Sequence, residues 1–512
     1  SNTEGAANTA VGRDALDANT TGSNNTAVGY DALDGNTEAD GNTAVGHSAL
    51  KNNTTGAGNV AVGTDALKAN TTTTGNVAVG FEAGKIVTDG AGILAIGYRA
   101  YDNADNEDNN LAIGYDALGG AVNGGEYNVA IGNYTLDALT SADHNTVIGY
   151  NAGSALTTTD NNTFVGSNSG INATTATGNT ILGSFAVGAG VLTGNNNVVI
   201  GKLAGNDMTS ADANVLIGED AGANITTGVS NVVIGQGAGE ALTSPERAIF
   251  IGQNAGNGHD TENDNIGIGY EALGGSVAGG EFNVAIGNNA LDALTSGDHN
   301  VAMGYNAGTG VSSGGHNVTI GNASGAIIST GGANICIGSD AGTAGTALTT
   351  GDTNIFIGQS INAAASGRLR SIVIGTTGSV SKGDNTTFIS ANGGGSFNGA
   401  NTTTWNQSSD RRIKKNIVDN NTGLDAINKI QVRDFEYRTL EEITDFDSPE
   451  SAMVDKQGTQ LGAIAQELEE ILPDLITETS QGVKTLNADN LTWYLINAVK
   501  ELSAEIKALK GE

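Results

Sequence analysis

The chain has 512 residues, of which 77 are glycine and 3 proline, with only one cysteine, and aromatic residues make up 4%. Abundant glycine without proline excludes collagen, an apolar share of 38% is too high for a disordered linker, and a single cysteine excludes a disulfide scaffold. The formal net charge of −33 excludes nucleic acid and anionic lipid as expected partners, because both would be repelled.

A short repeat, called a rung here, fills the chain from its start to Gly375, with a period of about 17 residues. The pattern Asn-x-x-aliphatic-Gly recurs in 22 copies from Gly12 to Gly375, and a few rungs are slightly longer, as between Gly338 and Gly358. Residues 116–153 reappear at 271–308, an offset of nine rungs, so the shaft contains a duplicated block. Such a period is typical of a solenoid. At about 4.8 Å per rung, the rungs would form a rod on the order of 100 Å long.

Each rung contains one expected short strand just before its glycine. The residues three and one before the glycine share one face of the strand, where stacked copies form an apolar ladder. The residue between them should face the other way and, in a lone coil, should be polar. It is instead apolar in most copies, as at Ala61, Phe164 and Cys336, the last of which we interpret as a small hydrophobe. We therefore expect both faces to be buried, which requires a second chain.

The glycine and the asparagine of each rung have separate expected roles. The glycine should supply a corner with positive φ. The asparagine, present four residues before the glycine in 19 of 22 copies, should stack into an amide ladder that satisfies the turn backbone.

These Asn-x-Ala-Ile/Val-Gly rungs resemble the head repeats of trimeric autotransporter adhesins, and similar rungs are common in fibres of tailed phages. The resemblance covers about residues 1–375, although the adhesin repeat is shorter than the period of this chain. It implies a mainly β fold in which three chains build a left-handed parallel β-roll, or solenoid, shaft.

The repeat lapses over residues 376–408, which we interpret as a distal tip or linker. Phe388, Phe397 and Trp405 lie there among small polar residues. Aromatic rings beside amides and hydroxyls suit carbohydrate, so these three are candidate receptor-binding residues. The alternative is a structural tip that only covers the open edge of the ladder.

Composition changes near Ser408. Residues 1–408 hold 10 Lys and Arg, whereas residues 409–512 hold 12 in a quarter of that length. In this second part we expect a small α+β domain. One helix is expected within 460–476 and ends at Pro473, with three apolar residues on one face: Ile464, Leu468 and Ile471. A last helix is capped near Asn487 or Asp489, and its apolar positions are spaced as a coiled-coil seam: Leu495, Val499, Leu502, Ile506 and Leu509.

Three features of residues 409–512 go together: Ser409-Asp410-x-Arg412-x-Lys414, the run from Gly462 to Glu467 followed by Pro473, and the last helix. With these features the segment resembles the intramolecular-chaperone, auto-processing domain of phage tail fibres, tailspikes and endosialidases. The resemblance implies a self-cleaving serine protease that acts once. It assigns the nucleophile to Ser409, the base to Lys414 and the cleaved bond to Ser408–Ser409.

This chemistry has a physical requirement. A serine hydroxyl attacks only when a base takes its proton. Free lysine side chains titrate near pH 10.4, so a lysine base needs cationic neighbours or burial to become neutral. The cationic neighbours are Arg411, Arg412 and Lys415, and assembly into a trimer would bury the lysine. Cleavage would then report correct assembly. The alternative is a charged loop that only solvates a domain junction.

Two weaker patterns are interpreted as structural. His144, His299 and His316 each precede a rung glycine by five residues, and we interpret them as surface turn residues rather than metal ligands. The acidic stretches 102–108 and 260–264 lack the spacing of a calcium loop, and we interpret them as solvated turns. We expect no metal and no cofactor.

The two resemblances together imply a trimeric phage tail fibre for host attachment, made in the host cytoplasm and carried on the virion. Expected partners are the other two chains, a host-surface glycan or protein receptor, and other tail proteins. Without a long apolar run or an export signal in the sequence, we expect no membrane insertion. The alternatives are a bacterial surface adhesin with the same chaperone domain and a polysaccharide-depolymerising tailspike, although no carboxylate or Ser/His pairing in the shaft indicates a further catalytic activity.

Overall fold

The structure, a computed structural model, describes residues 3–343, 348–391, 394–398, 405–406, 411, 414–445, 454, 456–479 and 482–511. The chain divides into two compact units, Ser1–Ser408 and Ser409–Glu512. The two units are described separately below.

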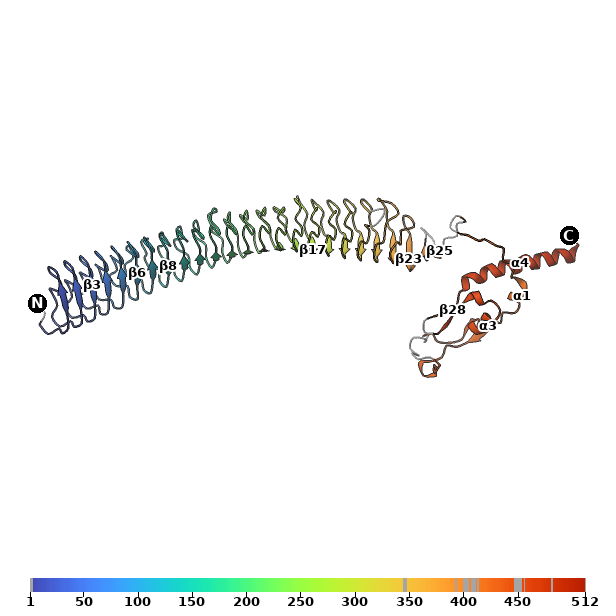
Figure 1. Ribbon diagram of the computed structural model, residues 1–512, viewed down its shortest axis with the longest axis horizontal. Coiled ribbons are helices and arrows are strands. Elements are labelled where there is room, and N and C mark those ends of the chain that lie inside the picture. Colours follow the sequence, from blue (N-terminus) through green and yellow to red (C-terminus); the bar gives the residue numbers. More distant parts are fainter. Residues whose placement is uncertain are drawn as a thin grey trace. The chain divides into compact units, whose positions relative to one another are not determined.

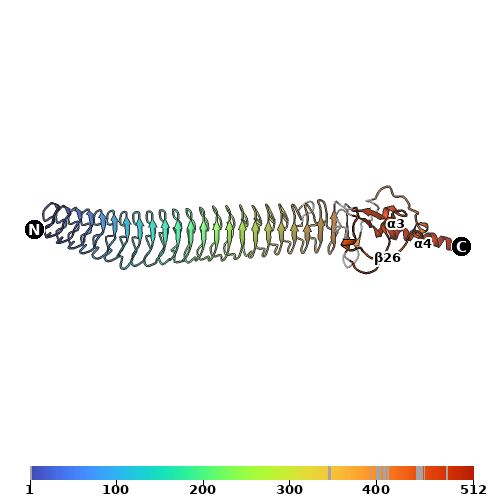
Figure 2. The same cartoon turned by 90° about the horizontal axis from the view of Figure 1, so that it is seen from below.

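The first unit is a long parallel β-solenoid, as the repeat predicts (Figure 1). Figure 2 shows its strands as one row of arrows that follow one another along the solenoid. The rung strands are β1 (Thr9–Val11), β2 (Thr26–Val28), β3 (Thr43–Val45), β4 (Val60–Val62), β5 (Val77–Val79), β6 (Leu94–Ile96), β7 (Leu111–Ile113), β8 (Val129–Ile131), β9 (Thr146–Ile148), β10 (Thr163–Val165), β11 (Thr180–Leu182), β12 (Val198–Ile200), β13 (Val215–Ile217), β14 (Val232–Ile234), β15 (Ile249–Ile251), β16 (Ile266–Ile268), β17 (Val284–Ile286), β18 (Val301–Met303), β19 (Val318–Ile320), β20 (Ile335–Ile337), β21 (Ile355–Ile357) and β22 (Ile372–Gly375).

The register keeps equivalent residues of neighbouring rungs side by side. In β12 and β13, for example, Val199 pairs with Leu216 and Ile200 pairs with Ile217. The longer rungs keep this register because their extra residues lie between the strands and not within them. Each position of the repeat therefore forms its own ladder along the shaft.

The strand face that points into the coil is the opposite of the one expected from the sequence. From β2 to β22 the middle residue of each strand points into the coil and is buried, as at Ala61, Phe164 and Cys336. The two flanking aliphatic residues point outward and stay half-buried or exposed, as at Val79, which is 37% exposed. The expectation that the middle residue faces outward was wrong, because small and apolar residues after the glycine, such as Ala32 and Leu33, close the core around it.

The rung asparagines form the predicted ladder inside the coil. The backbone N–H of Asn214 donates to Oδ1 of Asn197 at 3.0 Å, and the N–H of Asn231 donates to Oδ1 of Asn214 at 3.0 Å. Nδ2 of Asn214 donates to the carbonyl of Gly228 at 2.8 Å. These bonds satisfy turn backbone groups that burial would otherwise leave unpaired.

The rung glycines form the predicted corners with positive φ. Gly201 has a φ of 144°, and a Cβ built on it would lie 2.2 Å from the carbonyl oxygen of Gly218 in the next rung. Both the backbone angle and the close approach of the next rung therefore exclude other residues here.

The ladder continues past the last rung glycine. Strand β23 (Thr387–Ala391) pairs in parallel with β22, so that Phe388 stacks on Val373 inside the coil. Two antiparallel strands follow, β24 (Gly394–Asn398) and β25 (Trp405–Asn406). The last coil is thus closed by a turn back of the chain.

The second unit is small and mixed. It contains α1 (Leu424–Ile427), β26 (Arg433–Phe435), the 3-10 turns η2 (Leu440–Glu442) and η3 (Pro473–Leu475), β27 (Gln460–Gly462), α3 (Ala465–Glu469), β28 (Ile476–Glu478), β29 (Lys484–Leu486) and α4 (Ala488–Lys510). Strands β26 and β27 pair antiparallel, as do β28 and β29. The helix expected within 460–476 is shorter than predicted, because residues 460–462 pair as β27. It also ends at Glu469 and not at Pro473, so Ile464 and Ile471 flank the helix.

Helix α4 confirms the last predicted helix and its cap. The side chain of Asn487 accepts a hydrogen bond from the N–H of Asp489 at 3.2 Å, which caps the helix start. The helix ends at Gly511, which has a φ of 69°.

Candidate functional site

The predicted cleavage segment lies at the start of the second unit. Ser408, Ser409 and Arg412 are outside the described residues. Lys414 is exposed in the single chain, and its backbone N–H donates to the carbonyl of Arg411 at 3.2 Å, which makes a turn directly after the predicted cleavage point. The Ser409–Lys414 dyad and the Ser408–Ser409 bond stay predictions.

The chain after Lys414 is held by helix α4. Nδ2 of Asn497 donates to the carbonyl of Asn420 at 2.7 Å and to that of Thr422 at 3.1 Å. The backbone N–H of Leu424 donates to Oε2 of Glu501 at 2.6 Å. Asn497 and Glu501 are separated by one helical turn, so they lie on one face of α4.

Gly423 lets this segment lie directly on the helix. A Cβ at Gly423 would be 2.8 Å from the backbone nitrogen of Ala498 and 2.7 Å from Oε1 of Glu501. A larger residue would push the segment away from α4. Residues 420–424 and the two side chains that bind them are called the α4 clamp below.

The same region of α4 packs on the core of the unit. Ala426, Leu468, Leu472, Leu475 and Tyr494 form that core. The hydroxyl of Tyr494 donates to Oδ2 of Asp474 at 2.6 Å. This hydrogen bond, together with burial, raises the pKa of Tyr494 above its ordinary value. The contact therefore fixes the start of α4 against η3.

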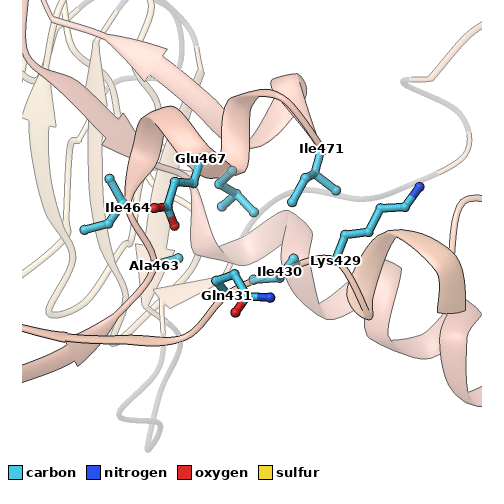
Figure 3. Close-up of a pocket in the computed structure, with 8 residues that line it drawn as sticks. Lys429, Ile430, Gln431, Ala463, Ile464, Glu467 and Ile471 are labelled. Carbon is cyan, nitrogen blue, oxygen red and sulfur yellow. The ribbon is translucent and has the colours of Figure 1, made fainter.

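A shallow pocket lies between α3 and the chain after α1 (Figure 3). Ile464, Glu467 and Ile471 face Ile430 and Gln431 across it. Its lining is mostly aliphatic and contains no serine, cysteine or histidine. We interpret this pocket as a packing gap and not as a catalytic site.

The predicted seam of α4 is exposed in the single chain. Leu495 and Leu502 are each 44% exposed and Leu509 is 87% exposed; Val499 and Ile506 are exposed as well. A row of large aliphatic side chains open to water favours association with another apolar surface.

The three candidate receptor residues have different positions. Phe388 is 4% exposed, and Nζ of Lys382 lies 4.4 Å from the centre of its ring, so a ligand does not reach this ring in the structure. Phe397 and Trp405 belong to β24 and β25, and their side chains are outside the described residues. Both stay predictions.

The sequence reasoning missed exposed aromatic rows on the shaft. Phe81, Tyr98 and Tyr115 follow the glycines of three successive rungs, and their rings stack with centroids 5.1 and 4.9 Å apart. Each of these three residues is about 40% exposed. The signal was present in the sequence, because aromatic residues one rung apart occupy the same ladder position.

The three histidines are exposed turn residues. His144, His299 and His316 all have left-handed backbones. The rings of His299 and His316 stack with centroids 4.9 Å apart, and His144 stacks on Tyr127. Each ring therefore packs on the neighbouring rung.

In the acidic turns, one carboxylate binds backbone amides. Glu107 accepts from the N–H groups of Asp105, Asn106 and Gly124 at 2.8 to 3.1 Å. Glu262, its copy in the duplicated region, accepts from three equivalent N–H groups. Burial raises the pKa of Glu262, but these hydrogen bonds outweigh it and the pKa is lowered overall. In the described part of the chain, no three histidine, cysteine or acidic residues cluster as a metal site.

Comparison with known families supports the interpretation of the second unit as an intramolecular-chaperone domain. Residues 409–477 match a peptidase family whose model is described as chaperone of endosialidase. No curated protein and no solved structure matches the chain. Among the described residues, no helix has the length and apolar character needed to span a membrane. The family match and the solenoid of short, regular rungs fit a phage tail fibre with a chaperone domain.

Proposed function

We propose that the chain forms a trimeric phage tail fibre that attaches to the host surface and matures by one self-cleavage between Ser408 and Ser409. The observation that carries this proposal is the match of residues 409–477 to the chaperone of endosialidase family, placed directly after a parallel β-solenoid. We propose the virion as its location, with other tail proteins and a host glycan or protein receptor as partners.

Two exposed apolar surfaces support assembly from several chains. The outward aliphatic residues of the rung strands form one continuous ladder, in which Met303 is 41% and Ile374 39% exposed. The seam of α4 is the second surface. Burying such surfaces against other copies of the chain is favourable by roughly 25 cal/mol per Å². A trimer covers the ladders of all three chains around one axis.

The proposed chemistry is an acyl transfer within the chain. Oγ of Ser409 attacks the carbonyl carbon of Ser408, and its proton passes to Nζ of Lys414. The amide nitrogen of Ser409 takes a proton as the peptide bond breaks, and water then hydrolyses the ester. The products are a shaft that ends at Ser408 and a fragment that begins at Ser409.

The test is expression of the full chain, followed by denaturing gels and mass spectrometry. We expect a released fragment that starts at Ser409 and has the mass of residues 409–512. Ser409→Ala or Lys414→Ala should leave one full-length band, while Lys456→Ala, an exposed lysine of the same unit that is distant in sequence from this loop, should still cleave. Undiminished cleavage in both dyad variants would remove these residues from the mechanism.

Cleavage should follow assembly. Leu495→Asp with Leu502→Asp places carboxylates in the seam, where a buried unpaired charge costs several kcal/mol. This variant should be uncleaved and fail to form trimers in analytical ultracentrifugation. Efficient cleavage by a monomer would contradict the order.

A further inference from the structure

We propose that Asn497 and Glu501 couple assembly of helix α4 to self-cleavage, by holding the chain that follows Lys414. This inference rests on the proposed self-cleavage and assigns it two positioning residues. Both lie beyond residues 409–477, the segment that matches the chaperone family.

The first step of the argument is that the clamp binds backbone, not side chains. Asn497 donates to the carbonyls of Asn420 and Thr422, and Glu501 accepts from the N–H of Leu424. Each of these bonds joins parts of the chain that are far apart in sequence. Three backbone bonds over five residues fix the path of the segment irrespective of its side chains.

The second step is the short connection to the predicted base. Only five residues separate Lys414 from Asn420. A chain of this length spans at most about 20 Å when fully extended. The position of α4 therefore restricts where the backbone of Lys414 can lie.

The third step is the arrangement of α4 itself. At about 100° per residue, Tyr494, Asn497 and Glu501 lie on one side of the helix, and Leu495, Val499 and Leu502 lie roughly 130° further round it. One face of the helix therefore holds residues 420–424, while another presents the exposed seam. When three seams pack together, the helices take fixed positions. Because each clamp holds residues 420–424 on its helix, the short connection back to Lys414 is then confined in each of the three chains.

Neither clamp residue touches the reacting atoms in this proposal. They act through the path of residues 415–424. The proposal therefore separates two effects: loss of the clamp should slow cleavage, while assembly through the seam should remain.

The experiment follows cleavage of the full chain by timed cell-free synthesis and denaturing gels, with oligomeric state measured by analytical ultracentrifugation. Asn497→Asp keeps the side-chain size but replaces the donating amide with a carboxylate that repels the two carbonyls. Glu501→Ala removes the acceptor. Each variant should form trimers but cleave at least about tenfold more slowly, as expected for displacement of a reacting group.

Two control variants test whether slower cleavage comes from loss of the clamp hydrogen bonds and not from any change in α4. Glu501→Gln retains an oxygen that can accept from Leu424 and should cleave nearly as fast as the unchanged chain. Glu505→Ala removes an exposed carboxylate one turn further along α4 and should have no effect.

A second variant leaves the helix untouched. Two glycines inserted between Asp419 and Asn420 keep both the clamp and the seam but loosen the connection to Lys414, and should also slow cleavage. Normal cleavage by trimers of the clamp variants or of the insertion variant overturns the proposal. Loss of trimers in both clamp variants also overturns it, because the clamp would then serve assembly. If the unchanged chain does not cleave, or if Ser409→Ala cleaves normally, it is the proposed self-cleavage that fails.

Discussion

Phe356 and Ile357 are neighbours in strand β21, yet Phe356 is fully buried in the coil while Ile357 is 36% exposed on the outer face. The same alternation recurs along the shaft. Each chain can thus close its own core and still present an apolar ladder to other chains.

This relationship predicts different results for two kinds of substitution. Phe356→Asp places a charge inside the coil, at a cost of several kcal/mol, and should prevent folding of the surrounding rungs. Ile357→Asp with Ile374→Asp should leave the circular dichroism of the coil intact but weaken trimers in ultracentrifugation. Ser360→Asp is the control, because it adds a charge at a turn position where other rungs carry aspartate, as at Asp340. Stable trimers of the double variant would show that the outer ladder is not the interface.

The glycine corners predict a contrast between Gly132 and Gly124. A Cβ at Gly132 would lie 2.3 Å from the carbonyl oxygen of Gly149, whereas a Cβ at Gly124 would meet nothing within 4 Å. Both residues have positive φ. Gly124→Ala should therefore cost only about 1–2 kcal/mol of backbone strain, and Gly132→Ala clearly more, because the rungs must move apart. Guanidinium unfolding midpoints would measure both, and equal midpoints would contradict the steric explanation.

Buried His259 predicts a loss of shaft stability in acid. Burial lowers the pKa of His259 to about 4, although the nearby Glu262 carboxylate opposes the shift. Well above pH 6.5 the ring is neutral in both the folded and unfolded chain. As the pH falls from 6.5 to 4, the unfolded chain gains a proton that the folded chain excludes, at a cost of about 3 kcal/mol per chain.

The duplicated region supplies the matched variant. The position equivalent to His259 one block earlier is Ala104, which is also buried. His259→Ala should lower the unfolding midpoint at neutral pH, because it leaves a cavity, but should lose less stability on acidification than the unchanged shaft. Equal losses in the two proteins would show that His259 does not carry this pH dependence.

The receptor hypothesis predicts that the tip and the shaft differ in host binding. Trp405→Ala with Phe397→Ala should abolish binding to host cells, while leaving a folded, cleaved trimer, because stacking surfaces for sugar rings are lost. Tyr98→Ala with Tyr115→Ala, in the aromatic row of the shaft, should bind normally. If the first variant binds and the second does not, the aromatic row becomes the candidate site.

Much of the shaft could be predicted from the sequence, because its information is local and repeated. A glycine, an asparagine and two aliphatic residues at fixed spacing were sufficient to predict a solenoid, its corners and its amide ladder. The seam and the cap of α4 could also be predicted from the sequence, because helix periodicity and capping depend on residues within a few positions of each other.

Only the tertiary structure decided which face of each strand lies inside. The side chains of a three-residue strand point alternately to two faces, and the strand sequence alone does not say which face the rest of the coil covers. The residues after the glycine, such as Ala32 and Leu33, decide this because they fill the interior. The structure also placed Phe388 in a further coil that lacks a rung glycine. The α4 clamp joins residues that are distant in sequence, as Leu424 and Glu501 are. No local pattern encodes such a pairing, because it depends on how the whole unit packs.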